Sequence, residues 1–517
     1  MVGAYELSAN SFSRYLVQLS GQILSKVNKE IAKDLLGISI RLAQKDSTIW
    51  GIDTEAATRL NWVDLPIQSR ELMPQLDSLS AWARTNKLDR VILCGMGGSS
   101  LAAEVIAAAY GKELLVVDST HPAQILSASA TDLTHSVIII GSKSGTTIET
   151  TSHLKLFTSK LIELGLAPRD HLVIITDPST PLDISSRQQG LRVVNADPNV
   201  GGRYSALSAF GLVPAALMGI DTSVLLDDAD ALSQILITTD SPAISIASIL
   251  FTETKQFVNL CDLNSKLPGL SDWIEQLIAE STGKNQQGRL PVVIEDPSEA
   301  TKDLIIGFAK GDFDLSIEAS LGEQFILWEW VTALLCYLLK VDPFNQPNVT
   351  EAKERTSQIL LKMGSKEFAA QEPILETASY LLYSNQKISN LQDFLKTPAS
   401  YIAVMTYLAR GKDDQIMKIR SALSKKLDKP VTFGWGPRFL HSTGQIHKGG
   451  QPNGCFIQIT TDNAIDLPVP NEEFTFANLL MAQALGDAAA LTERNLPLIR
   501  VHLKDNKTGI TDLLKEF

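Results

Sequence analysis

The sequence has few cysteines, no long apolar run free of charge, and no leader-like N-terminus. Its four cysteines lie far apart and form no C-x-x-C pair, which predicts reduced, mostly buried thiols in a cytoplasmic protein. The most apolar predicted helix, Phe325–Leu339, contains Glu329 and is too short to cross a bilayer. Because no basic segment followed by an apolar one occurs at the N-terminus, we expect no signal peptide.

Basic residues are outnumbered by acidic ones, 46 to 58, which gives a formal net charge of −12. This excess predicts no nucleic acid and no membrane as partners. A protein of this charge that binds an anion must concentrate positive potential locally, so single Lys and Arg residues in glycine-rich turns are candidates for such a site. The pattern G-x-x-x-x-G-K-[ST] is absent as well, which disfavours a P-loop nucleotide site.

The chain is long enough, at 517 residues, for two or three globular domains with a large core. Residues 1–80 show helical spacing of apolar side chains, which predicts a helical N-terminal arm. Residues 81–235 alternate apolar runs with helical stretches, which predicts an α/β domain with a largely parallel sheet flanked by helices. Residues 236–517 repeat this pattern less clearly and predict a second α/β domain, with a helical excursion over 365–398. The predicted strands are 90–94, 113–118, 136–141, 172–176, 191–196, 291–294, 401–407, 431–435 and 455–459.

The segment 136–150, SVIIIGSKSGTTIET, is the most informative stretch of the chain. Its apolar half is typical of a strand buried on both faces of a parallel sheet. The turn that follows contains many hydroxyls, one lysine and a glycine, and it leads into a predicted helix. Short donors, one point charge and a helix N-terminus together favour a phosphate site, although a plain hydrophilic turn is the alternative.

A second glycine-rich turn lies in RVILCGMGGSS, residues 90–100. Two such turns, about 45 residues apart, suit neighbouring strands whose loops meet at one edge of a sheet, where open α/β sheets bind ligands. The turn lacks the full G-x-G-x-x-G spacing of a dinucleotide site. Asp118, at the end of the next predicted strand, keeps a nucleotide-binding alternative open.

Four segments occur in one order along the chain: SKSGTTIET (142–150), GGRYSALSAFGL (201–212), ESTGK (280–284) and PFNQPNVTEAK (343–353). Together they resemble the glucose-6-phosphate isomerase family, which is built of two sugar-isomerase (SIS) domains. The run GPRFLHSTGQIHKGG (436–450) makes the chain most similar to the isomerase part of the fused transaldolase–glucose-6-phosphate isomerase proteins. The resemblance implies two SIS-type α/β domains and an aldose–ketose isomerase of carbohydrate metabolism. Such an enzyme interconverts glucose 6-phosphate and fructose 6-phosphate through ring opening and an enediolate, without a metal or other cofactor.

The resemblance also implies which residues bind the phosphate group of the substrate. They are Ser142, Lys143, Ser144 and Thr147, and Gly98 and Ser99 are implied to close the substrate site from the neighbouring turn. Physical chemistry agrees with this set, because charge-assisted hydrogen bonds to phosphate are short and strong. The alternative for Lys143 is a solvated surface lysine.

Three further residues are implied for the chemical step. Glu280 is the base that moves a proton between C1 and C2, and Arg203 lies over the negative charge of the enediolate. Gln276, one turn before Glu280 on the same predicted helix face, contacts the substrate. From the residues alone, Glu280 could be a solvated glutamate at a helix end, and Arg203 a structural salt-bridge partner.

Lys353 and Gln346 match the lysine and glutamine of a signature of the family, F-[DN]-Q-x-G-V-E-x-x-K. The lysine is implied to contact the ring oxygen or a hydroxyl of the substrate as the ring opens. Asn348 and Thr350 stand where the signature has Gly and Glu, so this loop departs from the family pattern at two positions.

A histidine is expected to open the sugar ring, but none occurs between Glu280 and Lys353, where most of the family carries it. The segment LHSTGQIHKGG supplies His441 and, as the second choice, His447, each of which could instead be a structural hydrogen-bonding residue. Glu149 matches the family glutamate that orients this histidine.

Two other functions fit the same motifs. One is an isomerase for another hexose 6-phosphate, such as mannose 6-phosphate, because the configuration at C2 is not readable from the sequence. The other is a non-catalytic SIS protein that senses sugar phosphates, which would need the turn at 142–147 but not Glu280, Arg203 and Lys353. The resemblance further implies a homodimer.

Overall fold

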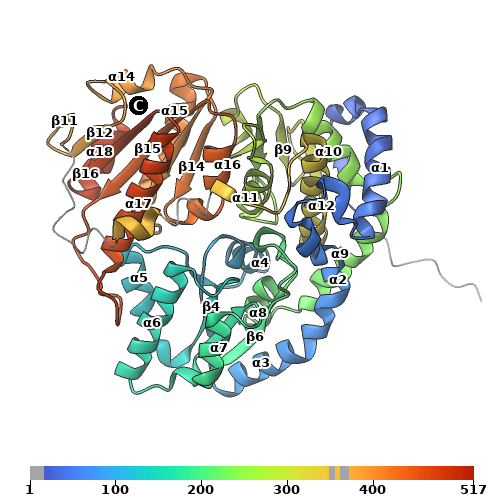
Figure 1. Cartoon of the computed structure of the whole chain (residues 1–517), viewed down its shortest axis with the longest axis horizontal. Helices are drawn as coiled ribbons and strands as arrows, with labels where there is room; N and C mark the ends of the chain where they lie inside the picture. Colours follow the sequence, from blue (N-terminus) through green and yellow to red (C-terminus); the bar gives the residue numbers. More distant parts are fainter. Residues whose placement is uncertain (1–16, 349–354, 361–371) are drawn as a thin grey trace, which may run out of the picture.

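A computed structural model describes residues 17–348, 355–360 and 372–517, which fold around three β-sheets (Figure 1). The predicted class is confirmed: the sheets are largely parallel and helices flank them. We refer to them as the first sheet (within residues 90–195), the middle sheet (residues 18–20 and 257–318) and the C-terminal sheet (residues 375–503). Among the described residues, no helix combines the length and the apolar character needed to cross a membrane.

The first sheet has the strand order β3-β2-β4-β5-β6, with all strands parallel. Odd-numbered strand residues such as Leu93 and Ile139 pack in the core that α4 and α8 share, whereas Ile92 and Ile140 pack beneath α5, α6 and α7. Burial on both faces explains the continuous apolar runs that made these strands predictable. The elements are β2 (Arg90–Gly95), α4 (Leu101–Ala109), β3 (Leu115–Val117), α5 (Pro122–Ser129), β4 (Ser136–Gly141), α6 (Ile148–Glu163), β5 (Leu172–Thr176), α7 (Pro181–Gln188), β6 (Arg192–Asn195) and α8 (Ala209–Leu217).

The N-terminal arm is mainly helical over its described part, residues 17–80. Its regular elements are β1 (Gln18–Ser20), α1 (Lys29–Ala43), α2 (Leu65–Gln68) and the first half of α3 (Met73–Thr85). The arm lies along one side of the molecule, where α1 packs against α10 and α12 (Figure 1). Strand β1 adds an antiparallel edge to the middle sheet, so the arm is part of the fold.

The middle sheet has the order β1-β10-β9-β7-β8, and only β1 is antiparallel. One face packs on a helical layer in which α12 is buried along almost its whole length. The elements are α9 (Thr222–Leu236), α10 (Pro242–Thr252), β7 (Phe257–Cys261), α11 (Leu270–Thr282), β8 (Leu290–Ile294), β9 (Ile305–Gly307), β10 (Leu315–Glu318) and α12 (Leu321–Leu339). Helix α11 ends at the centre of the molecule, between the three sheets (Figure 1).

The C-terminal sheet has the order β11-β12-β16-β15-β13-β14. Its last four strands are parallel, and β11 and β12 are antiparallel additions. Helices α14, α15 and α18 cover one face, and α16 and α17 cover the other. The elements are β11 (Leu375–Glu376), β12 (Tyr380–Ser384), α14 (Leu391–Leu395), β13 (Tyr401–Thr406), α15 (Lys418–Leu427), β14 (Val431–Trp435), α16 (Gly444–Gly449), β15 (Gly454–Thr461), α17 (Phe476–Glu493), β16 (Leu498–Leu503) and α18 (Asn506–Leu514).

Residues 236–517 differ from the prediction, because they contribute to two sheets where one was expected. The predicted strand at 291–294 pairs with β7, which is not among the predicted strands, and not with the strand at 401–407. The excursion predicted as helical over 365–398 contains β11, β12 and only one short helix, α14, in its described part. The physical reason is that strand pairing is a long-range choice, which short apolar runs do not encode locally.

The four cysteines are all buried and free, as predicted.

Candidate active site

A cavity of about 370 Å³ lies between the first sheet, the end of α11 and the segment before α16. It brings together ten of the residues that the sequence predicts for the site. They are Gly98, Ser99, Lys143, Ser144, Thr147, Arg203, Gln276, Glu280, Gln346 and His441. The hydroxyl-rich turn after β4 and the carboxylate of Glu280 therefore face one shared space.

The turn after β4 forms a nest of donors at the start of α6. Gly145 adopts a left-handed conformation, with φ of +67°, which turns the chain sharply before the helix begins at Ile148. The buried Ser142 hydroxyl donates to the Thr147 hydroxyl over 3.1 Å, so it supports the nest from beneath. The helix N-terminus and the hydroxyls that line the cavity suit a phosphate group.

Lys143 lies at the edge of this nest and is held by oxygen acceptors. Its Nζ donates to Oδ2 of Asp177 over 2.6 Å and to the carbonyl oxygens of Asp197 and Pro198, both over 3.2 Å. Burial lowers the pKa of Lys143, and the ion pair with Asp177 opposes that shift. The ammonium group is therefore positioned by the protein before any anion arrives.

The glycine-rich turn after β2 packs directly on the turn that carries Arg203. A Cβ atom on Gly98 would lie 2.1 Å from the carbonyl oxygen of Gly202, so only glycine permits this close approach. The contact places the GGR turn against the same cavity as the phosphate nest.

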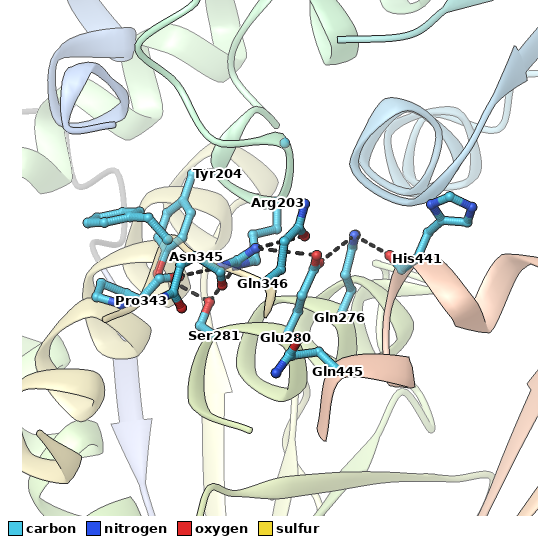
Figure 2. Close-up of polar contacts among 12 residues, drawn as sticks. Arg203, Tyr204, Gln276, Glu280, Ser281, Pro343, Asn345, Gln346, His441 and Gln445 are labelled. Atoms are coloured by element: carbon cyan, nitrogen blue, oxygen red, sulfur yellow. Dashed lines mark hydrogen bonds and ion pairs between the residues drawn. The ribbon is translucent and has the colours of Figure 1, made fainter. Parts of the chain in front are cut away.

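Arg203 and Glu280 form a buried ion pair at the base of the cavity (Figure 2). The NH1 group of Arg203 lies 3.3 Å from Oε1 of Glu280, and both residues are 5% exposed. The guanidinium also donates to Ser281 Oγ over 2.8 Å and to the carbonyl oxygens of Pro343 and Asn345. These bonds fix the plane of the guanidinium, so that it presents a preorganised positive charge next to the carboxylate.

Gln276 connects Glu280 to the segment that carries His441 (Figure 2). Its Nε2 donates to Oε2 of Glu280 over 3.2 Å and to the backbone carbonyl of His441 over 2.8 Å. The first bond spans four residues of α11, as the predicted helix face requires.

The His441 ring is oriented by a chain of buried polar groups. Its Nε2 lies 2.9 Å from Oε1 of Glu149, in the first turn of α6. Gln483, on α17, donates to the same Glu149 oxygen over 2.6 Å and accepts from the Thr120 hydroxyl over 2.7 Å. The histidine–glutamate contact agrees with the sequence prediction, and its support from α17 was not foreseen.

Lys284, the last residue of the ESTGK segment, positions the loop that carries Gln346. Its Nζ donates to the carbonyl oxygen of Asp342. Burial lowers the pKa of Lys284 to about 7, and the neighbouring Arg203 acts in the same direction.

Among the described residues, His447 is a predicted site residue that does not line this cavity. His447 is buried between Tyr401 and Phe456, and its Nδ1 lies 3.1 Å from the Tyr401 hydroxyl. Burial lowers the pKa of His447 to about 3, so the ring is neutral at physiological pH. His447 therefore has a structural role, because it packs against strands β13 and β15 of the C-terminal sheet. Lys353 lies outside the described residues.

The cavity contains residues that sequence reasoning missed. Glu55 and Arg59 reach it from a short 3-10 helix of the N-terminal arm (Glu55–Thr58) and its end. Arg59 donates to the carbonyl oxygen of Pro198 over 2.7 Å, and Lys143 donates to the same oxygen. Asp177, the partner of Lys143, also lines the cavity. No local pattern marks these residues, because they reach the site only through the packing of distant segments.

The chain is similar to known proteins over much of its length. The family model described as phosphoglucose isomerase matches residues 9–290. The chain is 30% identical over 261 residues to glucose-6-phosphate isomerase from Thermus thermophilus, which covers 48% of this chain and 62% of that protein. It is 29% identical over 257 residues to glucose-6-phosphate isomerase from Methanocaldococcus jannaschii, covering 45% of this chain and 64% of that protein.

A solved structure shares the fold at lower identity. The glucose-6-phosphate isomerase of Chlamydia trachomatis superposes with a TM-score of 0.56 at 18% identity, over 68% of this chain and 89% of that chain. The first curated relatives are matched over 49% to 64% of their own length. The family model ends at Leu290, so it does not include Gln346 or His441.

Proposed function

This chain belongs to the phosphoglucose isomerase family, and on that premise we propose that it interconverts glucose 6-phosphate and fructose 6-phosphate. The observation that carries the proposal is the single cavity in which the phosphate nest at 142–147 faces the Arg203–Glu280 pair. A substrate anchored by its phosphate group in that nest would extend its reactive carbons toward Glu280.

The proposed mechanism assigns one task to each polar group. His441, oriented by Glu149, assists ring opening by moving a proton to or from the ring oxygen. Glu280 then removes the proton from C2 of the open aldose and returns it to C1, while the proton of the C2 hydroxyl passes to O1, so that C2 becomes the carbonyl carbon. Arg203 stabilises the negative charge of the enediolate between these two steps. Lys353 remains assigned to the substrate by resemblance alone.

The phosphate group supplies binding energy remote from the reacting carbons. The hydroxyls of Ser144 and Thr147 and the ammonium of Lys143 are its proposed ligands. Gln276 and Gln346, which line the same cavity, are proposed to contact the sugar hydroxyls. A homodimer and a cytoplasmic location remain predictions, and light scattering of the purified protein would test the former.

The decisive experiment replaces the base. We expect Glu280→Gln to lower kcat for fructose 6-phosphate formation by about 10³-fold or more, since positioned acid–base groups contribute factors of this order. Glu113→Gln, which removes an exposed carboxylate in the turn before β3, is the matched control and should retain full activity. Equal melting temperatures of both variants would show that the fold survives.

Isotope exchange separates the enediolate mechanism from other routes. In D₂O the wild-type protein should incorporate solvent deuterium at C1 of fructose 6-phosphate, and Glu280→Gln should lose exchange together with turnover. Full turnover by Glu280→Gln would contradict the assigned base. Turnover of mannose 6-phosphate in preference to glucose 6-phosphate would replace the proposed substrate by its C2 epimer.

A further inference from the structure

A second cavity, of about 640 Å³, lies where the middle sheet and the C-terminal sheet meet. Strands β8 and β14 are the facing edge strands of these two sheets. Asp262 follows β7, Glu295 follows β8 and Trp435 ends β14, and all three line the cavity. The cavity therefore lies at the carboxyl ends of parallel strands, which is where open α/β sheets bind ligands.

The positive charges around this cavity are already compensated by groups outside its lining. The NH1 group of Arg438 lies 2.7 Å from Oε2 of Glu104 and 2.6 Å from Oδ2 of Asp118. Arg410 also forms an ion pair with Glu104. The third arginine of the lining, Arg420, pairs with Glu299. An anionic ligand would have to compete with these carboxylates, so the arginines do not make an anion site.

The acidic side chains of the lining are less well compensated. Asp262 caps the start of α11 by accepting from the backbone N–H groups of Gly269 and Ser271, over 2.8 and 3.2 Å. Glu275 is only 9% exposed, yet it has no hydrogen-bond or ion-pair partner among the described residues. Asp272 lies one turn earlier on the same helix and lines the same cavity.

Burial without a hydrogen-bond partner disfavours the ionised form of a carboxyl group. Burial raises the pKa of Glu275 well above its usual value, with Asp272 adding to the shift and Arg438 opposing it. A cation in the cavity would replace the lost hydration of this group and remove the penalty.

Aromatic side chains also line the cavity. Phe433 and Trp435 project from the same face of β14, with ring centroids 5.3 Å apart at an angle of 84°. Aromatic faces attract organic cations, and Trp does so best. Within the described ranges, no group of three or more His, Cys, Asp or Glu side chains is arranged to hold a metal ion. Carboxylates and aromatic rings in one lining thus favour an organic cation over a metal.

We propose that this cavity is a binding site for a small organic cation with a guanidinium or primary ammonium group, whose charge faces Glu275 and Asp272 and whose alkyl part lies against Trp435. The volume is within the range of ordinary small-molecule pockets. The site is separate from the sugar-phosphate cavity, although Glu275 is the chain neighbour of Gln276 and Ser442 that of His441.

Butylguanidinium and its neutral isostere butylurea test the proposal, with isothermal titration calorimetry on the purified full chain. We expect butylguanidinium to bind with a Kd of about 1 mM or lower, and butylurea to bind at least about tenfold more weakly, because only the cation pairs with carboxylates and rings. Equal affinities, or no binding of butylguanidinium, would overturn the proposal.

Two variants locate the binding site. Glu275→Gln keeps the shape of the side chain and should weaken butylguanidinium binding by about tenfold, and Trp435→Leu should weaken it by a smaller factor. Glu113→Gln is the control and should bind as the wild type does. Wild-type affinity in both site variants would show that the cation binds elsewhere and would refute the assignment. Because calorimetry needs no turnover, this result is independent of the isomerase proposal.

Discussion

Two carboxyl-terminal edges of parallel sheets in this molecule hold cavities of opposite chemical character. The first sheet ends in glycine-rich turns with hydroxyls and Lys143, around a cavity that suits a phosphate group. The edges of the middle and C-terminal sheets end in Asp262, Glu295 and Trp435, around a cavity that suits a cation. The segment that joins β14 to α16 contributes to both cavities, with His441 in the first and Arg438 and Ser442 in the second.

The backbone determines where each cavity lies, and the side chains determine which ligand it suits. A parallel sheet places turn residues together at the ends of its strands, whatever those residues are. The sign of the ligand then follows from the charged and polar groups that line each cavity. In the first cavity Lys143 is only partly buried, and in the second Glu275 is buried and unpaired among the described residues.

Removing the positive charge from the anion site should have the largest effect of the variants that probe this contrast. We expect Lys143→Met to lower kcat/KM for fructose 6-phosphate by about 100-fold, since hydrogen bonds to charged groups are worth about 1.5–3 kcal/mol. The change also leaves the Asp177 carboxylate near the bound phosphate without its ammonium partner. Steady-state kinetics measures the loss, mainly as a rise in KM.

The matched control is Lys33→Met, which removes an exposed lysine on α1. It should leave kcat/KM unchanged, and Lys143→Met should leave the affinity for butylguanidinium unchanged. A wild-type KM in Lys143→Met would mean that the nest at 142–147 does not hold the phosphate. A loss of butylguanidinium binding in that variant would mean that the two cavities are not independent.

An intermediate effect is expected at Gln483, the residue of α17 that reaches Glu149. Gln483→Met removes the 2.6 Å hydrogen bond to Glu149 and nearly preserves the volume of the side chain. Because Glu149 orients His441, kcat should fall by about tenfold, whereas KM should stay within about twofold because the phosphate ligands are untouched. Steady-state kinetics with both substrates measures this split.

Gln68→Met, on the exposed side of α2, is the control for this prediction. A fall in kcat that is accompanied by a clear fall in melting temperature would indicate a general loss of packing. A rise in KM with unchanged kcat would instead place Gln483 among the groups that position the phosphate. It would contradict the role of Gln483 in orienting Glu149 and His441.

The sequence was most informative where neighbours in the chain are also neighbours in space. The strands of the first sheet and the turn at 142–147 could be predicted because one buried strand leads directly into one turn and one helix. The pairing of Gln276 with Glu280 followed from the spacing of four residues on one helix. Each of these inferences uses contacts within a few residues or within consecutive βα units.

The remaining parts depend on contacts between segments that are not neighbours in the chain. Strands β7 and β8 pair with each other instead of joining the C-terminal sheet, and no local signal states this choice. His447 belongs to the same motif as His441, but the turn of α16 directs it into an aromatic core. Gln483 was not foreseen because it meets Glu149 across 334 positions of the chain.

The smallest expected effect concerns Arg59, which extends the anion site from the N-terminal arm. Its guanidinium is partly exposed and lies near enough to Lys143 to lower the pKa of that lysine, so it adds positive potential at the phosphate end. Arg59→Gln should raise KM about threefold with unchanged kcat, as expected for an exposed charge, and should make KM less sensitive to salt. Arg70→Gln, an exposed arginine paired with Asp227, should change neither quantity. An unchanged KM and salt dependence in Arg59→Gln would confine the anion site to the first sheet, whereas a threefold rise would show that the arm takes part in it.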